Sequence, residues 1–315
     1  MILSLILSSL LTFVQLNCEN MFDCADDSLT QDSEYLPESG KYWTPGKYWK
    51  KLNSIGKEII ACGEDGAEWR LPDIVALCEI ENDSVMRDLT KRSLLRKAGY
   101  EYVMTNSADV RGIDVALMYS PFSFKPLSHY SLRVDRVRDM RPTRDILYVK
   151  GLIRGGDTLH VFVVHAPSRY GGKKNTERHR LQVAERLRQA TDSIRSLYAE
   201  AKIIVSGDFN DESTDRSLRE ICGSGLFNIS ATAKGSNGAK GTYKYKGEWS
   251  RIDHILASGS MTRILKDCRI NDAEFLLESD ETYGGVQPMR TYNGYRYNGG
   301  YSDHLPIVAR FGVDN

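Results

Sequence analysis

Short apolar runs recur from one end of the chain to the other, and this repetition limits the fold more than any other feature. Such runs bounded by polar residues are typical of buried strands. They occur at 11–16 (LTFVQL), 73–80 (DIVALCEI), 113–120 (IDVALMYS), 145–153 (DILYVKGLI), 158–165 (TLHVFVVH), 202–207 (KIIVSG), 251–258 (RIDHILAS) and 305–311 (LPIVARF). The fourth and fifth runs flank a Gly-Gly-Asp segment, which predicts a hairpin turn between them.

Longer stretches with helical spacing lie between these runs. They span residues 48–62, 84–99 and 176–201, and the second is predicted to stop at Gly99. The chain has 315 residues, of which 41% are hydrophobic, and this is enough for a sizeable core of the α/β class. No linker or repeat divides the sequence, so we expect a single domain over residues 11–315.

The first residues, MILSLILSSLLTFVQL, are continuously apolar. They are too few for a transmembrane helix, which needs about 20 residues. Residues 1–10 resemble the apolar part of a signal peptide, although they lack a basic region and an A-x-A cleavage site. We therefore expect a leader-like segment at 1–10, no stable membrane span and export from the cytoplasm. The alternative is a cytoplasmic protein whose core includes the segment.

Overall charge and cysteine spacing narrow the function classes. Lys+Arg and Asp+Glu both number 42, so no bulk basic field draws the chain onto nucleic acid, although a local basic groove would suffice. The six cysteines form no CxxC pair, which leaves a zinc ribbon without support. A chain of this size does not need a disulfide framework, but the even number leaves one or two bridges open.

Polar side chains stand repeatedly at the edges of the predicted strands. They are Asn17 and Glu19, Glu79, His165, Asp208 and Asn210, Asp253, and Asp303 and His304. Each instance alone is an ordinary transition from strand to loop. Burying several carboxylates without partners is costly, however, and a shared metal ion makes such clustering tolerable.

The residue types favour one kind of metal chemistry. Carboxylates such as Glu19 and Glu79 suit Mg²⁺ or Mn²⁺ better than zinc, and Mg²⁺ favours one or two carboxylates together with water and phosphate oxygens. The zinc-hydrolase pattern H-E-x-x-H, a P-loop and a G-x-G-x-x-G motif after a strand are absent from the sequence. The histidines, amides and further aspartates would serve a phosphate that gains negative charge as water attacks.

The ordered motifs LNCEN, ALCEIEN, VVHAPS, SGDFND, RIDHILAS and YSDHLP resemble the endonuclease/exonuclease/phosphatase superfamily. This metal-dependent group includes pancreatic deoxyribonuclease, abasic-site endonucleases, inositol polyphosphate 5-phosphatases and neutral sphingomyelinases. The resemblance covers residues 11–311, nearly the whole chain. It implies an α/β fold, a four-layer sandwich in which two mixed β-sheets pack face to face and helices cover the outside.

The resemblance also implies a metal site. Glu79 resembles the metal-binding glutamate of the family, and Asn17 the asparagine beside it. Glu19 lies where an acidic residue adds to the metal shell. Asp303 lies where the family has a further carboxylate near the metal. The implied cofactor is Mg²⁺ or Mn²⁺.

The remaining motif residues are implied to carry out the reaction. Asp208 resembles the aspartate that orients or deprotonates the attacking water, and Asn210 resembles the amide that holds the phosphate. His304 resembles the histidine that contacts the scissile phosphate, with Asp253 as its orienting carboxylate. His165 matches a histidine of the deoxyribonuclease-like members that faces the leaving group as a general acid, whereas the abasic-site branch lacks it.

These features predict a divalent-metal-dependent hydrolase of phosphate esters that cleaves phosphodiesters in a nuclease-like way, by in-line attack of an activated water. The alternatives are a phosphomonoesterase or a lipid- or inositol-phosphate phosphodiesterase of the same fold, and a non-catalytic binding module. We expect a phosphate-ester substrate, with nucleic acid as one choice, and a monomeric protein.

Overall fold

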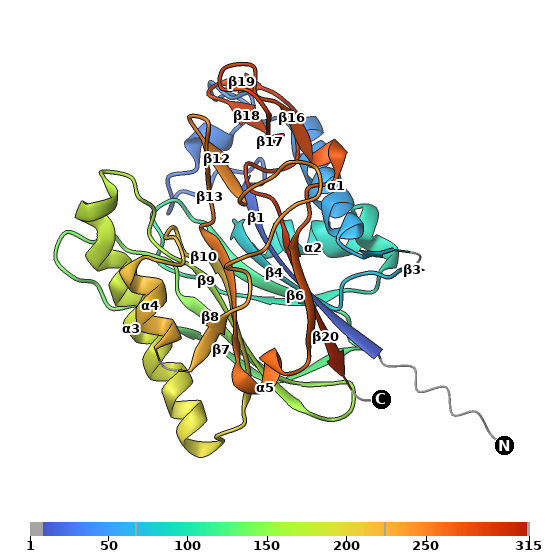
Figure 1. Cartoon of the computed structure of the whole chain (residues 1–315). Helices are drawn as coiled ribbons and strands as arrows, with labels where there is room; N and C mark the ends of the chain where they lie inside the picture. The colour runs from blue at the N-terminus through green and yellow to red at the C-terminus, as the bar shows by residue number, and fades with distance from the viewer. Residues whose placement is uncertain (1–8, 67, 224, 314–315) are drawn as a thin grey trace.

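The computed structural model describes residues 9–313 apart from residues 67 and 224, and two six-stranded sheets form its centre (Figure 1). The first sheet has the order β15-β20-β1-β4-β6-β5. Its strands are β15 (Leu265–Ile270), β20 (Ile307–Val313), β1 (Ser9–Met21), β4 (Ile74–Ile80), β6 (Asp114–Tyr119) and β5 (Glu101–Met104). Strands β1 and β4 are parallel and the other neighbours are antiparallel, so the sheet is mixed.

The second sheet has the order β11-β14-β10-β9-β8-β7. Its strands are β11 (Leu226–Asn228), β14 (Asp253–Ser258), β10 (Lys202–Asp208), β9 (Thr158–His165), β8 (Ile146–Ile153) and β7 (Phe124–Leu132). Only β9 and β10 run parallel, so this sheet is mixed as well. The hairpin predicted between β8 and β9 is confirmed.

Alternating side chains explain how the sheets and helices form layers. Phe13 of β1 and Val161 of β9 belong to the core between the sheets. The next residue, Val14, faces the opposite way and packs with Leu52 of α1 (Pro45–Ala61). On the other side of the sandwich, Leu187 of α3 (Lys173–Leu197) covers the second sheet. Because successive side chains in a strand point to opposite faces, each sheet has two apolar faces, one for its partner sheet and one for helices.

The smaller elements complete the outer layers and one rim. Helices α1 and α2 (Asp83–Lys91) lie outside the first sheet, and α3 and α4 (Arg216–Cys222) outside the second, as Figure 1 shows. The short helix α5 (Gly259–Thr262) follows β14. Short hairpins β12–β13 (Tyr243–Tyr245, Glu248–Ser250), β16–β17 (Leu277–Ser279, Val286–Pro288) and β18–β19 (Tyr292–Asn293, Arg296–Tyr297) gather at one end of the sandwich. The predicted four-layer α/β sandwich is confirmed.

Some boundaries differ from the sequence-based expectation. The helix expected over 84–99 ends at Lys91, because the Ser93 hydroxyl accepts a hydrogen bond from Leu95 N and starts a separate 3-10 turn, Leu94–Lys97. The strand expected from residue 11 begins at Ser9, so residues 9 and 10 of the leader-like segment belong to β1. Residues 1–8 lie outside the described residues, and export stays a prediction.

Two further open points concern the thiols and the membrane. All six cysteines have free thiols, so none of the disulfides left open by the sequence is formed. Across the described part of the chain, no helix combines the length and apolar character that crossing a bilayer requires.

A buried acid in α1 makes stability depend on pH. Glu58 is fully buried, and neither of its carboxylate oxygens has a hydrogen-bond partner among the described residues. Burial raises the pKa of Glu58 to about 8, although the positive charge of Lys51 opposes this shift. The folded protein therefore keeps the Glu58 proton in a pH range where the unfolded chain has lost it.

We expect Glu58→Gln to remove part of this pH dependence. The folded pKa lies above the unfolded value, so the stabilisation is complete below about pH 4.5 and is lost as the pH rises through about 8. At about pH 9 the variant should be more stable than wild type by about 2–4 kcal/mol, and the difference should shrink at about pH 5. Thermal unfolding at both pH values measures this, and an equal difference at the two values would contradict it.

Candidate active site

The strand directions of the first sheet bring distant motifs to one edge. Asn17 of β1 pairs with Cys78 of β4, so Glu79 follows at the same parallel strand ends. Strand β20 runs antiparallel to β1, and its first residue Ile307 pairs with Gln15. The segment before β20, with His304, therefore lies where β1 and β4 end. The Ser302 hydroxyl fixes this position by donating to Asn17 O over 2.6 Å.

The second sheet supplies its residues at the matching edge. His165 and Asp208 end the parallel strands β9 and β10 and are paired in register. Strand β14 is antiparallel to β10, so its first residue Asp253 pairs with Asp208. The two sheets meet through Asn17, whose Nδ2 donates to Asp208 Oδ2 over 3.1 Å.

Backbone conformation marks the same strand ends. Glu19, Asn20, Glu79 and Asn210 all have positive φ, between 51° and 63°. Regular pairing between β1 and β4 is also interrupted between Asn17 and Met21. Non-glycine residues adopt this left-handed conformation at a cost of about 1–3 kcal/mol, and it concentrates at functional sites. Strained backbone therefore gathers at the strand ends that carry these polar residues.

Glu79 is an ionised carboxylate at the centre of this edge. Its Oε2 accepts from Asn20 N over 2.7 Å, and its Oε1 lies 3.4 Å from Asn17 Nδ2. Burial opposes ionisation, but the surrounding positive charge, to which Arg111 contributes most, outweighs it and lowers the pKa of Glu79 to about 2. Oxygen Oε1 has only long contacts, so it is the oxygen best able to accept a cation.

Asp208 is a further carboxylate at this edge, and it is buried and held in place by two amides. Its Oδ1 accepts from Asn210 N over 2.8 Å, while Oδ2 accepts from Asn17 Nδ2. Burial, and then the negative charge of Asp253, raise the pKa of Asp208 to about 7. The Asn210 side chain donates to Ala166 O over 3.1 Å, which fixes the turn after β10.

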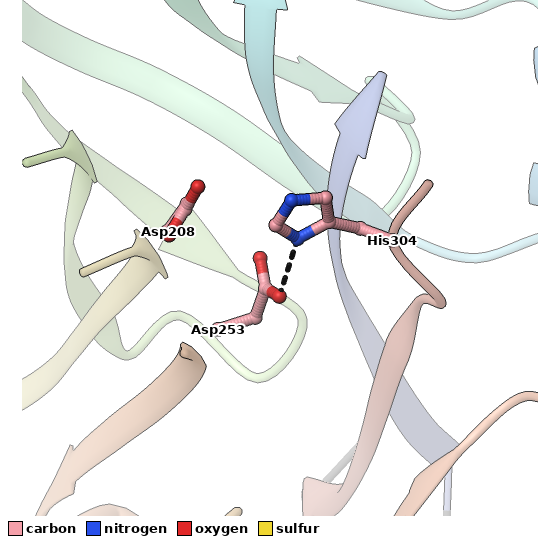
Figure 2. Close-up of side chains that lie close together, drawn as sticks. All are labelled: Asp208, Asp253 and His304. Carbon is pink, nitrogen blue, oxygen red and sulfur yellow. Dashed lines mark hydrogen bonds and ion pairs between the residues drawn. The ribbon is translucent and has the colours of Figure 1, made fainter. Parts of the chain in front are cut away.

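Asp253 and His304 form a buried acid–imidazole pair beside Asp208 (Figure 2). His304 Nδ1 lies 2.7 Å from Asp253 Oδ2. Gln15 and Thr242 donate to the two Asp253 oxygens over 3.0 and 2.5 Å, so this carboxylate is fully hydrogen-bonded. Although burial opposes the charged imidazole, Asp253 raises the pKa of His304 well above its usual range.

The same three residues also offer a set of metal-ligand atoms. One donor atom from each of Asp208, Asp253 and His304 lies within 4.8 Å of the others. A metal here would compete with the proton on His304, because an imidazole must be neutral to coordinate. The short His304–Asp253 contact and the raised pKa of His304 favour a charged pair at these two residues rather than metal ligands.

His165 lies between the two carboxylates and an arginine. Its Nε2 is 3.6 Å from Asp208 Oδ2, 3.7 Å from Glu79 Oε1 and 3.3 Å from Arg144 Nη2. Burial, and then the positive charge of Arg144, hold the pKa of His165 well below its usual range. A neutral imidazole is a poor acid, so the lowered pKa favours a hydrogen-bonding role over the general-acid role that the resemblance implies.

Glu19 and Asp303 are placed differently from each other. Glu19 Oε2 accepts from Thr291 N over 2.7 Å and lies 3.4 Å from Lys51 Nζ, so it anchors the loop around Thr291. Burial raises the pKa of Glu19, with Lys51 opposing. Asp303 Oδ1 is 3.9 Å from His304 Nε2 and keeps a partly exposed position at the edge.

Several residues of the site were not predicted from the sequence. Gln15 interrupts an apolar strand, and a buried amide there could have been recognised as a partner of a motif residue. Lys51 lies within a regular helix pattern, while Arg111 and Arg144 lie in loops. Nothing in the sequence distinguishes them from ordinary surface charges, because their role depends on loop positions.

Comparison with known proteins places this arrangement in a family. The sequence model of the Endonuclease/Exonuclease/phosphatase family matches residues 12–312. A search of curated proteins finds no match. Solved structures with the same architecture include truncated TDP2 from Caenorhabditis elegans, at 16% identity and a TM-score of 0.61, covering 96% of this chain and 98% of that one.

Two other solved structures extend the comparison. The mannosyl-6-phosphatase of Bacteroides thetaiotaomicron is 17% identical with a TM-score of 0.61, over 95% of this chain and 98% of that one. The catalytic domain of human nocturnin, which contains a bound sulfate, is 19% identical with a TM-score of 0.58. This match covers 96% of this chain and 94% of that one. At these identities the likeness shows a shared fold.

Proposed function

Because the chain belongs to the endonuclease/exonuclease/phosphatase family, we propose that it is a divalent-metal-dependent phosphoesterase that uses a water activated for in-line attack. One observation carries the proposal. An ionised Glu79, an amide-held Asp208 and the Asp253–His304 pair converge at one edge of the sandwich. Such a set can hold a cation, position a water and stabilise charge on a phosphate.

Glu79 is the residue best suited to hold the metal. It is ionised, and its Oε1 has no hydrogen bond shorter than 3.4 Å among the described residues. Asn17 would orient it, and Asp303 would approach the metal from the segment that precedes β20. Glu19 would support the site through the loop that it anchors. A bound Mg²⁺ or Mn²⁺ would polarise the phosphoryl oxygens and make the bound water more acidic.

The remaining residues would handle water and charge. Asp208 would orient the attacking water and take its proton, since two amides fix both of its oxygens. The His304 imidazolium, held by Asp253, would donate to a phosphate oxygen as negative charge develops. Asn210 would contact the phosphate from the turn after β10, and neutral His165 would hydrogen-bond on the side of Arg144.

The first expected result is that chelation abolishes activity. We expect EDTA to reduce turnover by at least about 10³-fold, because the metal would supply the main stabilisation of phosphoryl charge. Added Mg²⁺ or Mn²⁺ should restore it. The assay is a substrate panel of plasmid DNA, RNA, inositol phosphates, sphingomyelin and sugar phosphates. Turnover that is unchanged by EDTA would contradict the proposal.

The same panel separates the two substrate classes that fit the site. We propose phosphodiester cleavage of the nuclease type as one outcome and hydrolysis of small phosphate esters as the alternative. The zero net charge allows both. Phosphate contacts along nucleic acid release counterions, so a steep loss of rate with added salt would favour nucleic acid. A rate that does not change with added salt would favour a small substrate.

A further inference from the structure

A pocket adjoins the catalytic edge on the side of His165. Its volume is about 500 Å³, within the range of ligand pockets. The walls come from the loops at residues 109–111, 139–144 and 167–170 and from the first turns of α3. Two wall residues also contact the site: Arg144 Nη2 is 3.3 Å from His165 Nε2, and Arg111 Nη2 is 3.9 Å from Glu79 Oε2. We call this cavity the arginine pocket.

The lining of the arginine pocket carries a surplus of positive charge. Asp109 lies 3.6 Å from Arg144, and these two charges offset each other. Asp139 also lines the pocket, and its carboxylate accepts over 2.8 Å from Arg178, which lies outside the lining. Arg141 forms no hydrogen bond or ion pair with any described residue. Arg111 donates to Asn20 Oδ1 and lies beside Glu79, so the guanidinium charge that is left for a ligand is that of Arg141.

Buried polar atoms without partners occur in the same walls. Thr143 Oγ1 and His179 Nε2 are buried, and neither has a hydrogen-bond partner in the described part of the chain. Both side chains line the arginine pocket. Buried polar atoms are nearly always hydrogen-bonded in proteins, so a group of exceptions in one cavity indicates a polar ligand.

The beginning of α3 adds a further preference for anions. This helix of 25 residues starts at Lys173, with no side-chain cap and no acidic residue in its first turn. Its Thr176 and His179 line the pocket. The free N–H groups and the dipole at a helix N-terminus favour negative charge.

We propose that the arginine pocket binds a second phosphate group of the substrate, next to the phosphate that is cleaved. This inference rests on the proposed function, because the first phosphate must lie at Asp208 and His304. Guanidinium groups match phosphate oxygens with paired hydrogen bonds. A substrate with two phosphate groups would thus span the carboxylate edge and the arginine pocket, and the second group would fix which ester bond faces the water.

The test compares matched substrates in the presence of Mg²⁺. One arm uses alkanediol bisphosphates of increasing chain length against the corresponding alkyl monophosphates. The other uses a thymidine dinucleotide with and without a terminal phosphate, which distinguishes a nucleic-acid source of the second phosphate. The variant is Arg141→Gln, and Arg138→Gln is its control, because Arg138 is an exposed arginine of the same loop outside the pocket.

The second phosphate should lower KM by about tenfold or more in at least one arm, because a charge-assisted hydrogen bond strengthens binding by about that factor. Arg141→Gln should remove this gain and leave the KM for the monophosphate unchanged. Arg138→Gln should keep the gain. Equal KM values for the matched substrates, or a gain that survives in Arg141→Gln, would overturn the inference.

Calorimetry separates failure of the inference from failure of the proposed function. The bisphosphates are titrated into Asp208→Asn protein and into the same variant with Arg141→Gln. If wild type cleaves no phosphate ester, the proposed function fails. Binding that depends on Arg141 would still support the pocket, and binding that is absent or independent of Arg141 would overturn it.

Discussion

Replacing His304 by alanine should reduce turnover by about 10³-fold or more, with a much smaller change in KM. Nδ1 of His304 is held 2.7 Å from Asp253 Oδ2, and the pair carries a proton on the ring. That proton would stabilise charge that appears only as water attacks, so its loss acts mainly on kcat. Steady-state kinetics on the best substrate of the panel measure the effect.

The Asp253–His304 pair should behave as one unit. Asp253→Asn alone is expected to cost most of the same rate, because it removes the charge that keeps the imidazole protonated and oriented. Combining it with His304→Ala should then add little. If the rate loss of the double variant equalled the product of the two single losses, the two residues would act separately. Full activity of His304→Ala would exclude the proposed mechanism.

A second histidine provides the matched control. His160 is also buried, but it contacts Tyr148 through Nδ1 at 2.7 Å and has no contact with the site. His160→Ala should therefore lower the melting temperature while kcat stays near that of wild type. Equal losses of kcat in both variants would indicate that His304→Ala acts through folding.

The central strands could be predicted from sequence, whereas the edge strands could not. β1, β4, β9 and β10 are covered on both faces, so they are continuous apolar runs. The edge strand β7 contains Pro126 and is mostly exposed, and β15, at the edge of the first sheet, mixes charged and apolar residues. Without burial on both faces, an edge strand has no apolar run that distinguishes it from a loop.

The site shows the same division between local and distant information. Each motif residue lies beside an apolar strand, so the sequence could place it at a strand end. The partner of each residue depends on the pairing of strands. Glu19, expected near the metal, has its carboxylate bound to Thr291 N and Lys51, which come from other parts of the chain. Such contacts leave no local pattern.

Asp208→Asn should have effects of opposite sign on activity and stability. An amide cannot take a proton from water, so we expect turnover to fall by about 10³-fold or more. The raised pKa of Asp208 means that its charged form disfavours folding, and this penalty grows as the pH rises above the unfolded value. In EDTA at about pH 8, the variant should thus be as stable as wild type or more stable.

The neighbouring Asp211 is the control that makes this test decisive. Its Oδ1 is 2.8 Å from Arg180 Nε, and both side chains are buried. Asp211→Asn leaves a buried guanidinium without its partner, so stability should fall by about 3 kcal/mol while kcat is largely kept. If Asp208→Asn also lost stability and kept its activity, Asp208 would be a structural residue. Loss of turnover in a protein that is no less stable would assign the effect to the role of this carboxylate in the site and not to folding.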